Sequence, residues 1–142
     1  MKADLGKCKK LLDSGLSLVT VGESKVPNFA WKDKMTTPYS KDKFERDYNY
    51  NGGLFKKNGD EIQSTATIGI VTGYNGLEVL DIDLKIFSSL KEQQDFWNEL
   101  TSFIKDNIDD FDKKFVIYKT VNNGYHILYR CQNIAGNTKL AC

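Results

Sequence analysis

A stretch near the middle of the chain has the pattern of a long amphipathic helix. Ser89 is followed three residues later by Glu92, the spacing of a capping box, in which each side chain accepts a hydrogen bond from the other residue's backbone N–H. Apolar residues then recur at helical intervals and so share one face of the helix: Leu90, Trp97, Leu100, Phe103, Ile104 and Ile108. Such a stripe must be buried, so we expect this helix to pack on a sheet, with Trp97 and Phe103 in the core.

This helical segment lies between two patterns that are typical of β-hairpins. Before it, residues 67–71 and 77–83 are β-prone runs separated by a glycine-containing turn. After it, residues 115–120 and 125–130 are β-prone runs separated by the sequence Val-Asn-Asn-Gly, which ends at Gly124. The order of hairpin, long helix and hairpin predicts an α+β fold, in which helices pack on a mainly antiparallel sheet.

The N-terminal half predicts a shorter helix and a further strand. In residues 3–14 the apolar side chains recur at helical spacing, and Gly15 stands where a helix often ends. Residues 16–21 (LSLVTV) are typical of a strand. Residues 31–53 lack a clear period, and we expect them to be mostly irregular, with a short helix at 41–47. Because no linker or repeat is evident, we expect residues 1–142 to form a single domain or the N-terminal part of one.

Composition excludes several classes of protein. The net charge of +1 argues against strong nonspecific attraction to nucleic acid, which depends on clustered Lys and Arg. The chain has a single histidine and three cysteines, Cys8, Cys131 and Cys142, and these residues lack the spacing of a zinc site. Three cysteines are also too few, and odd in number, for a disulfide framework. No run is apolar and long enough to cross a bilayer, and the N-terminus lacks the apolar core of a signal peptide. We therefore expect a cytoplasmic protein with reduced thiols and no membrane partner.

Two carboxylates end the run 77–83. Alternate residues of a strand share a face, so Asp81 and Asp83 point the same way, with their Cα atoms about 7 Å apart. Their mutual repulsion favours a bound cation, and oxygen ligands without neighbouring His or Cys favour Mg²⁺ or Mn²⁺. The pair thus predicts a metal site that could support phosphoryl or nucleotidyl transfer. An Asp-x-Asp also occurs as a solvated strand end or at the start of a turn, and that interpretation stays open for the pair alone.

The histidine of the later hairpin is a second candidate for chemistry. Alternation places His126 and Arg130 on one face of their strand. Arg130 could bind a triphosphate with forked hydrogen bonds, while His126 donates one from an imidazole nitrogen. Lys85, just past the acidic pair, is a weaker candidate for phosphate binding, and Lys25 is weaker still. The alternative is a half-buried His126 that is hydrogen-bonded to a backbone carbonyl, with Arg130 solvated.

Taken in order, these motifs resemble the bifunctional DNA primase/polymerase (prim-pol) family of the archaeo-eukaryotic primase superfamily. That family has an Asp-x-Asp or Asp-x-Glu at a strand end and a small-x-His motif in a later strand. Its N-terminal part has a strand, a Lys-x-Pro element and a tryptophan. The matching blocks here are Leu18-Val-Thr-Val21, Lys25-Val-Pro27, Trp31-Lys32, Gly69-Ile-Val-Thr-Gly73, Gly76-Leu-Glu-Val-Leu-Asp-Ile-Asp-Leu-Lys85 and Asn123-Gly-Tyr-His-Ile-Leu-Tyr-Arg130.

The resemblance implies a nucleotidyltransferase with an RNA-recognition-like catalytic core. By this likeness Asp81 and Asp83 would bind the catalytic Mg²⁺ or Mn²⁺ ions, and His126 would contact the triphosphate of the incoming nucleotide. The implied partners are a single-stranded DNA template, nucleoside triphosphates and, in the full-length protein, a helicase domain. The family has a third acidic residue downstream of the histidine, whereas no acidic residue follows Asp112 here. We therefore expect a core that is incomplete at its C-terminus, with weak metal binding and little turnover from these residues alone.

Two other functions are compatible with the same residues. A metal-dependent nuclease would use the carboxylates to activate water instead of a nucleotide hydroxyl. A noncatalytic nucleic-acid-binding module would use the face of the sheet and would be insensitive to metal. Cleavage of DNA without nucleotides would favour the first, and binding that survives Asp81→Asn would favour the second.

Overall fold

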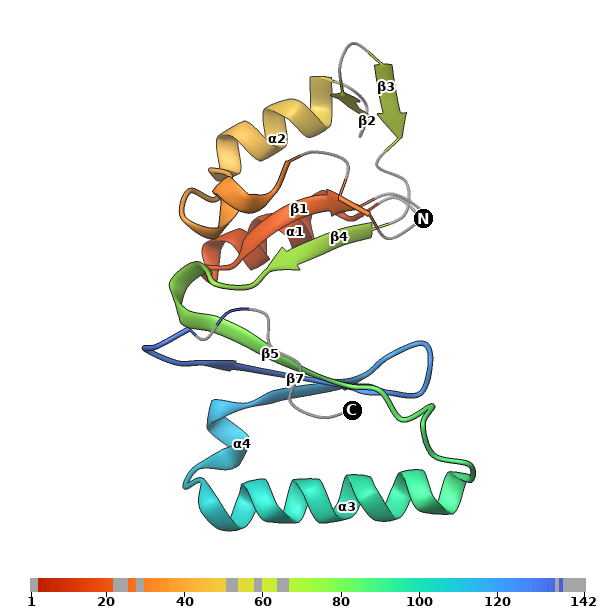
Figure 1. The fold of residues 1–142 in the computed structure, drawn as a ribbon. Helices are drawn as coiled ribbons and strands as arrows, with labels where there is room; N and C mark the ends of the chain where they lie inside the picture. Colours follow the sequence, from red (N-terminus) through yellow and green to blue (C-terminus); the bar gives the residue numbers. More distant parts are fainter. Residues whose placement is uncertain are drawn as a thin grey trace. The chain divides into compact units, whose positions relative to one another are not determined.

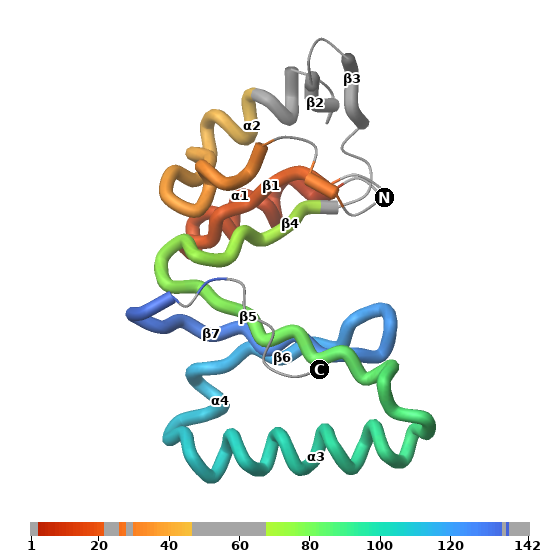
Figure 2. The backbone as a smooth tube through the Cα atoms, in the orientation of Figure 1, coloured from red at the N-terminus to blue at the C-terminus, as the bar shows by residue number. Residues whose placement is uncertain are grey.

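The computed structural model describes residues 3–21, 26–27, 30–50, 54–57, 60–63, 67–134 and 136 (Figure 1; Figure 2 draws the same backbone as a tube). Its contacts divide the chain into two compact units. Unit 1 consists of Met1–Gly76 with Ile134–Cys142, and unit 2 consists of Leu77–Asn133. The expectation of a single domain stays a prediction.

Unit 1 contains helices and short strands. In chain order they are α1 (Leu5–Asp13), β1 (Ser17–Val21), the 3₁₀ helix η1 (Lys32–Met35), α2 (Lys41–Tyr50), β2 (Leu54–Lys57), β3 (Asp60–Gln63), β4 (Thr67–Val71) and the 3₁₀ helix η2 (Tyr74–Gly76). The helix and the strand predicted for residues 3–21 are confirmed. The helix predicted at 41–47 is confirmed and extends to Tyr50, whereas the irregular structure expected at 32–35 is wrong, since these residues form η1.

The core of unit 1 joins its two α-helices to β1. Cys8 of α1, Leu18 of β1 and Phe44 of α2 are buried together. Asp4 caps the N-terminus of α1, where its side chain accepts a hydrogen bond from the Lys7 backbone N–H at 2.7 Å. Burial of one face of each helix against the same strand therefore fixes the three elements relative to one another.

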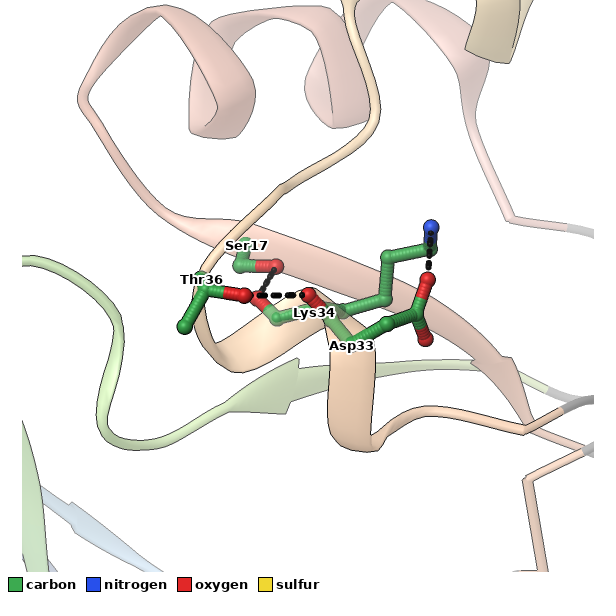
Figure 3. A network of polar contacts seen from close by, with 4 residues as sticks. All are labelled: Ser17, Asp33, Lys34 and Thr36. Atoms are coloured by element: carbon green, nitrogen blue, oxygen red, sulfur yellow. Dashed lines mark hydrogen bonds and ion pairs between the residues drawn. The ribbon is translucent and has the colours of Figure 1, made fainter.

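Polar contacts attach η1 to β1 (Figure 3). The Ser17 hydroxyl, which is fully buried, donates a hydrogen bond to the Lys34 carbonyl at 2.7 Å. Within the turn, the Thr36 hydroxyl donates to the Asp33 carbonyl at 3.1 Å, and the Lys34 ammonium lies 2.6 Å from the Asp33 carboxylate. The 3₁₀ turn thus satisfies a buried hydroxyl that would otherwise destabilise β1.

The predicted hairpin of residues 67–71 and 77–83 is wrong. β4 pairs antiparallel with β1, from Ser17↔Val71 to Val21↔Thr67, and the strand that follows η2 pairs elsewhere. The turn itself is present, with left-handed backbone at Gly73, Asn75 and Gly76, but it forms a 3₁₀ turn and does not close a hairpin. The physical reason is burial: Val71 of β4 is packed with Val19 and Val21 of β1, a contact that the local sequence does not reveal.

β2 and β3 form a further antiparallel pair, from Leu54↔Gln63 to Lys57↔Asp60. This hairpin is missing from the expectations above. The dipeptide Asn58-Gly59 between the strands is a strong local signal for a tight hairpin turn, so the sequence does contain the information that predicts it.

Unit 2 contains a helix packed on a three-stranded sheet (Figure 1). Its elements are β5 (Leu77–Ile82), α3 (Leu90–Asn107), the one-turn helix α4 (Phe111–Lys114), β6 (Val116–Lys119) and β7 (Tyr125–Arg130). The capping box is confirmed: the Ser89 hydroxyl accepts from the Glu92 N–H at 3.2 Å, and the Glu92 carboxylate accepts from the Ser89 N–H at 3.0 Å. The hairpin of β6 and β7 is also confirmed, and the strand order is β5-β7-β6.

One face of this sheet is covered by aromatic side chains. The Trp97 ring of α3 stacks on Tyr125 with 3.6 Å between ring centroids, and Phe115 packs against Tyr129 at 5.8 Å. Ile127, between these two tyrosines on the same face, is fully buried. The expectation that Phe103 lies in the core is wrong, because its side chain is 66% exposed. It lies about 100° around the helix from Ile104, which is buried.

The α+β class predicted from the sequence is confirmed. Every strand pair among the described residues is antiparallel, although the strands form three small sheets there. Each helix in the described part of the chain is too short or too polar to cross a membrane.

Candidate functional site

The sheet of unit 2 brings the two predicted motifs together. Asp81 of β5 lies directly opposite His126 of β7, and Tyr118 of β6 lies opposite His126 on the other side. Because β7 is the central strand, these three residues form a row across the sheet. The row lies on the face opposite Trp97, since Tyr125, which contacts Trp97, is the neighbour of His126 in the strand.

The side chains of this row are in contact. The His126 Nε2 atom lies 3.3 Å from Asp81 Oδ1, and the Tyr118 hydroxyl lies 2.6 Å from His126 Nδ1. The imidazole side chain is 32% exposed and the Asp81 side chain is 72% exposed. His126 is thus half-buried, as the alternative interpretation expected, but the partners of its ring nitrogens are side chains instead of a backbone carbonyl. The exposed Asp81 carboxylate leaves room for a ligand from solvent.

Asp83 follows the last residue of β5 and contacts Lys85. The Lys85 ammonium lies 2.7 Å from Asp83 Oδ2, and the Lys85 backbone N–H donates to Asp83 Oδ1 at 3.1 Å. Both bonds lower the pKa of the Asp83 carboxyl, the ammonium bond more than the backbone bond. The same ion pair raises the pKa of Lys85, and the charge of Asp81 adds to that effect. Lys85 therefore supplies the positive charge that the two carboxylates favour.

The carboxylates fit a magnesium or manganese ion in the kind of ligand they offer. Within the described residues, no group of three or more His, Cys, Asp or Glu side chains could hold a metal. Mg²⁺, however, is often held by one or two carboxylates together with water and substrate phosphates. Asp81 and Asp83 would be those carboxylates, and the Lys85 ammonium would have to leave Asp83 for both oxygens of that side chain to be available.

The other predicted phosphate ligands lie farther away or outside the described residues. Arg130 shares the face of His126 but lies opposite Leu77 at the other end of β5, four strand positions or about 13 Å along the strand. The structure thus brings Lys85, but not Arg130, next to the carboxylates. Lys25 lies outside the residues that the structure describes.

The sequence interpretation missed Tyr118, which contacts the histidine. The length of the hairpin turn could have predicted this contact. Once the turn is known, each residue of one strand can be paired with its partner in the other by counting outward from the turn. The Thr120 N–H donates to the Gly124 carbonyl at 2.8 Å, and this closure fixes Tyr118 opposite His126. Burial raises the pKa of the Tyr118 phenol, and the Asp81 charge raises it further, so the hydroxyl keeps its proton at neutral pH.

We expect Lys85→Met to increase the affinity of the chain for Mn²⁺. The methionine keeps the length of the side chain but removes the charge that pairs with Asp83 and that would compete there with a bound metal. The ion pair is exposed, so the gain should be modest, up to about fivefold. Electron paramagnetic resonance of free Mn²⁺ during a titration measures it. Lys91→Met, which removes an exposed lysine from α3, serves as the control, and an affinity that stays equal in both variants would contradict the competition.

Comparisons with known proteins do not assign the chain. It matches none of the protein-family models, curated proteins or solved structures. The interpretation of the site therefore depends on its own geometry and on the motif resemblance described above.

Proposed function

We propose that this chain belongs to a primase-polymerase, a nucleotidyltransferase that joins nucleoside triphosphates on a single-stranded DNA template. The observation that carries the proposal is the pairing of Asp81 with His126 across β5 and β7. Two motifs that are far apart in the sequence lie on one face of one sheet, with side-chain atoms 3.3 Å apart. A site that binds a metal through carboxylates and a triphosphate through a histidine needs these groups side by side.

The topology of unit 2 also supports the proposal. β5 and β6 are each antiparallel to β7 and are therefore parallel to each other, and α3 lies between them in the sequence. Two parallel strands joined by a helix, with a third strand inserted between them, form the split β-α-β arrangement of ferredoxin-like folds. This arrangement is compatible with the RNA-recognition-like core that the motif resemblance implies.

In the proposed reaction each residue of the site has a defined task. Asp81 and Asp83 would hold Mg²⁺ or Mn²⁺, which when bound assists attack of a 3′-hydroxyl on the α-phosphate and departure of pyrophosphate. His126 would donate a hydrogen bond from Nε2 to a phosphate oxygen. Lys85, once released from Asp83, would neutralise a further phosphate charge.

The test is incorporation of labelled nucleotides on a single-stranded template by the gene product that carries this chain. Asp81→Asn and His126→Ala should each lower the rate, the first by more than about a hundredfold, because a metal contributes several kcal/mol of charge stabilisation in the transition state. Mn²⁺ titration of the 142-residue chain should show weaker binding in Asp81→Asn but unchanged binding in His126→Ala.

Asp95→Asn is the matched control, because it makes the same chemical change at an exposed position of α3. It should leave both the rate and the metal affinity unchanged. Wild-type incorporation rates in Asp81→Asn and His126→Ala would overturn the proposal. Cleavage of DNA with Mg²⁺ and without nucleotides would assign the same carboxylates to a nuclease, and DNA binding that is independent of metal and of Asp81 would indicate a noncatalytic module.

A further inference from the structure

The histidine of the candidate site has a polar side chain beside each ring nitrogen. His126 Nε2 lies 3.3 Å from an Asp81 oxygen, and His126 Nδ1 lies 2.6 Å from the Tyr118 hydroxyl. The Tyr118 ring meets the imidazole edge-on, with 4.9 Å between centroids and 75° between planes. The imidazole is therefore held from both neighbouring strands.

The two contacts together select one tautomer of the neutral imidazole. A lone pair on Nε2 would face the negative charge of the Asp81 carboxylate 3.3 Å away, so in the neutral ring Nε2 carries the proton. Nδ1 of the same neutral ring is then an acceptor, and the phenol of Tyr118 must be the donor. The hydrogen bond at one ring nitrogen generally determines which nitrogen carries the proton.

We propose that Tyr118 is a positioning residue, whose hydroxyl donates to His126 Nδ1 and thereby keeps the Nε2–H directed toward the Asp81 carboxylate. Its meaning for catalysis rests on the proposed function, in which that N–H is the donor to a phosphate oxygen. The ring orientation and the tautomer, in contrast, are properties of the chain alone. Tyr118 would prepare the donor before any nucleotide binds.

A phenylalanine at this position separates positioning from simple packing. Tyr118→Phe keeps the aromatic ring beside the imidazole and removes the hydroxyl. The Tyr118 side chain is 45% exposed, so this change should leave the sheet folded. Tyr129→Phe is the matched control, because the Tyr129 hydroxyl donates to Glu78 at 2.7 Å on the opposite face of the sheet and does not contact His126.

Nuclear magnetic resonance can read the tautomer directly, because the chain has a single histidine. Two-bond ¹H–¹⁵N correlation spectra of the metal-free, ¹⁵N-labelled chain should be recorded at a pH at which the imidazole is neutral. We expect the Nε2–H tautomer in the wild type and in Asp81→Ala, where Tyr118 is the remaining partner. In Asp81→Ala/Tyr118→Phe, the tautomer populations should approach those of a solvent-exposed histidine, while Tyr129→Phe should match the wild type.

An Nδ1–H tautomer in the wild type would overturn the proposal, and so would identical spectra for Asp81→Ala and the double variant. A second readout tests the link to function. Tyr118→Phe should weaken binding of deoxyadenosine triphosphate roughly tenfold, as loss of a supporting hydrogen bond often does, and should leave Mn²⁺ affinity unchanged. If the tautomer behaves as expected but deoxyadenosine triphosphate does not bind even to the wild type, the proposed function fails and the role of Tyr118 in orienting His126 stands.

Discussion

Replacing Gly124 with alanine is expected to destabilise unit 2 by about 2–3 kcal/mol and to weaken the metal binding proposed for Asp81 and Asp83. Gly124 directly precedes β7, where the chain passes the end of β5. A Cβ atom at this position would overlap the carbonyl oxygen of Ile82 and would lie 3.2 Å from the Thr120 hydroxyl oxygen. A backbone carbonyl cannot move aside like the end of a flexible side chain. Because Ile82 stands between Asp81 and Asp83, a shift of its backbone also moves both carboxylates.

Urea unfolding followed by Trp97 fluorescence, in a Trp31→Phe background, measures the effect on stability. Trp97 reports on unit 2 because it stacks on Tyr125, the residue after Gly124. Asn122→Ala is the control, because Asn122 is an exposed residue of the same turn and its replacement adds no atom near the Ile82 carbonyl. If Gly124→Ala unfolds at the same urea concentration as the control, the close approach of the two strands does not require a glycine at position 124.

This close approach gives a physical meaning to the small residue of the predicted small-x-His motif. Gly124 lets the start of β7 lie against the end of β5, and two residues later His126 is aligned with Asp81. The glycine is required for space, in contrast to Gly73, whose positive φ of 95° requires a glycine for conformation. The close approach of Gly124 to Ile82 therefore accounts both for the small residue two positions before His126 and for the pairing of His126 with Asp81.

The elements that the sequence predicted well are those determined by neighbouring residues. The capping box of Ser89 and Glu92, the helical period of α3 and the turn before β7 each depend on contacts within a few positions. Alternation along a strand likewise placed His126 on the face opposite Tyr125 without any knowledge of the partner strand. Local periodicity was sufficient for these features.

Pairing between distant strands could not be predicted in the same way. The turn at residues 73–76 favoured a hairpin of β4 with β5, yet β4 pairs with β1, and Gly69 fits against the side chains of Val19 and Val21. The preference arises from packing across the whole of unit 1, which local signals do not contain. The missed contact of Tyr118 with His126 has a related cause, because it depends on the register between two strands.

The candidate site shows the same division. Alternation predicted a shared face for Asp81 and Asp83, but Asp83 lies just beyond the last residue of β5, and its ion pair with Lys85 depends on how the chain turns there. Sequence reasoning assigned the counter-charge to a divalent cation and Lys85 to a phosphate. The structure places the lysine on the Asp83 carboxylate, where the proposed metal would have to displace it.

Replacing Phe44 with alanine should lower the stability of unit 1 by about 3–5 kcal/mol. The Phe44 side chain is 2% exposed and packs with Cys8, Leu18 and the edge of the Tyr39 ring. Alanine would leave a cavity at the point where α1, β1 and α2 meet, because three elements held by separate contacts cannot all move inward to fill it.

Phe103→Ala makes the same chemical change at a position that is 66% exposed, and it should change stability by less than about 1 kcal/mol. Each substitution can be read by the tryptophan of its own unit: Trp31 in a Trp97→Phe background for Phe44, and Trp97 in a Trp31→Phe background for Phe103. If urea unfolding shows equal losses for the two phenylalanines, burial does not decide their contributions. A large loss of stability for Phe44→Ala alone would show that burial decides the contribution of each phenylalanine. Helical periodicity assigned Phe103 to the core because it does not tell how wide a face of the helix is buried.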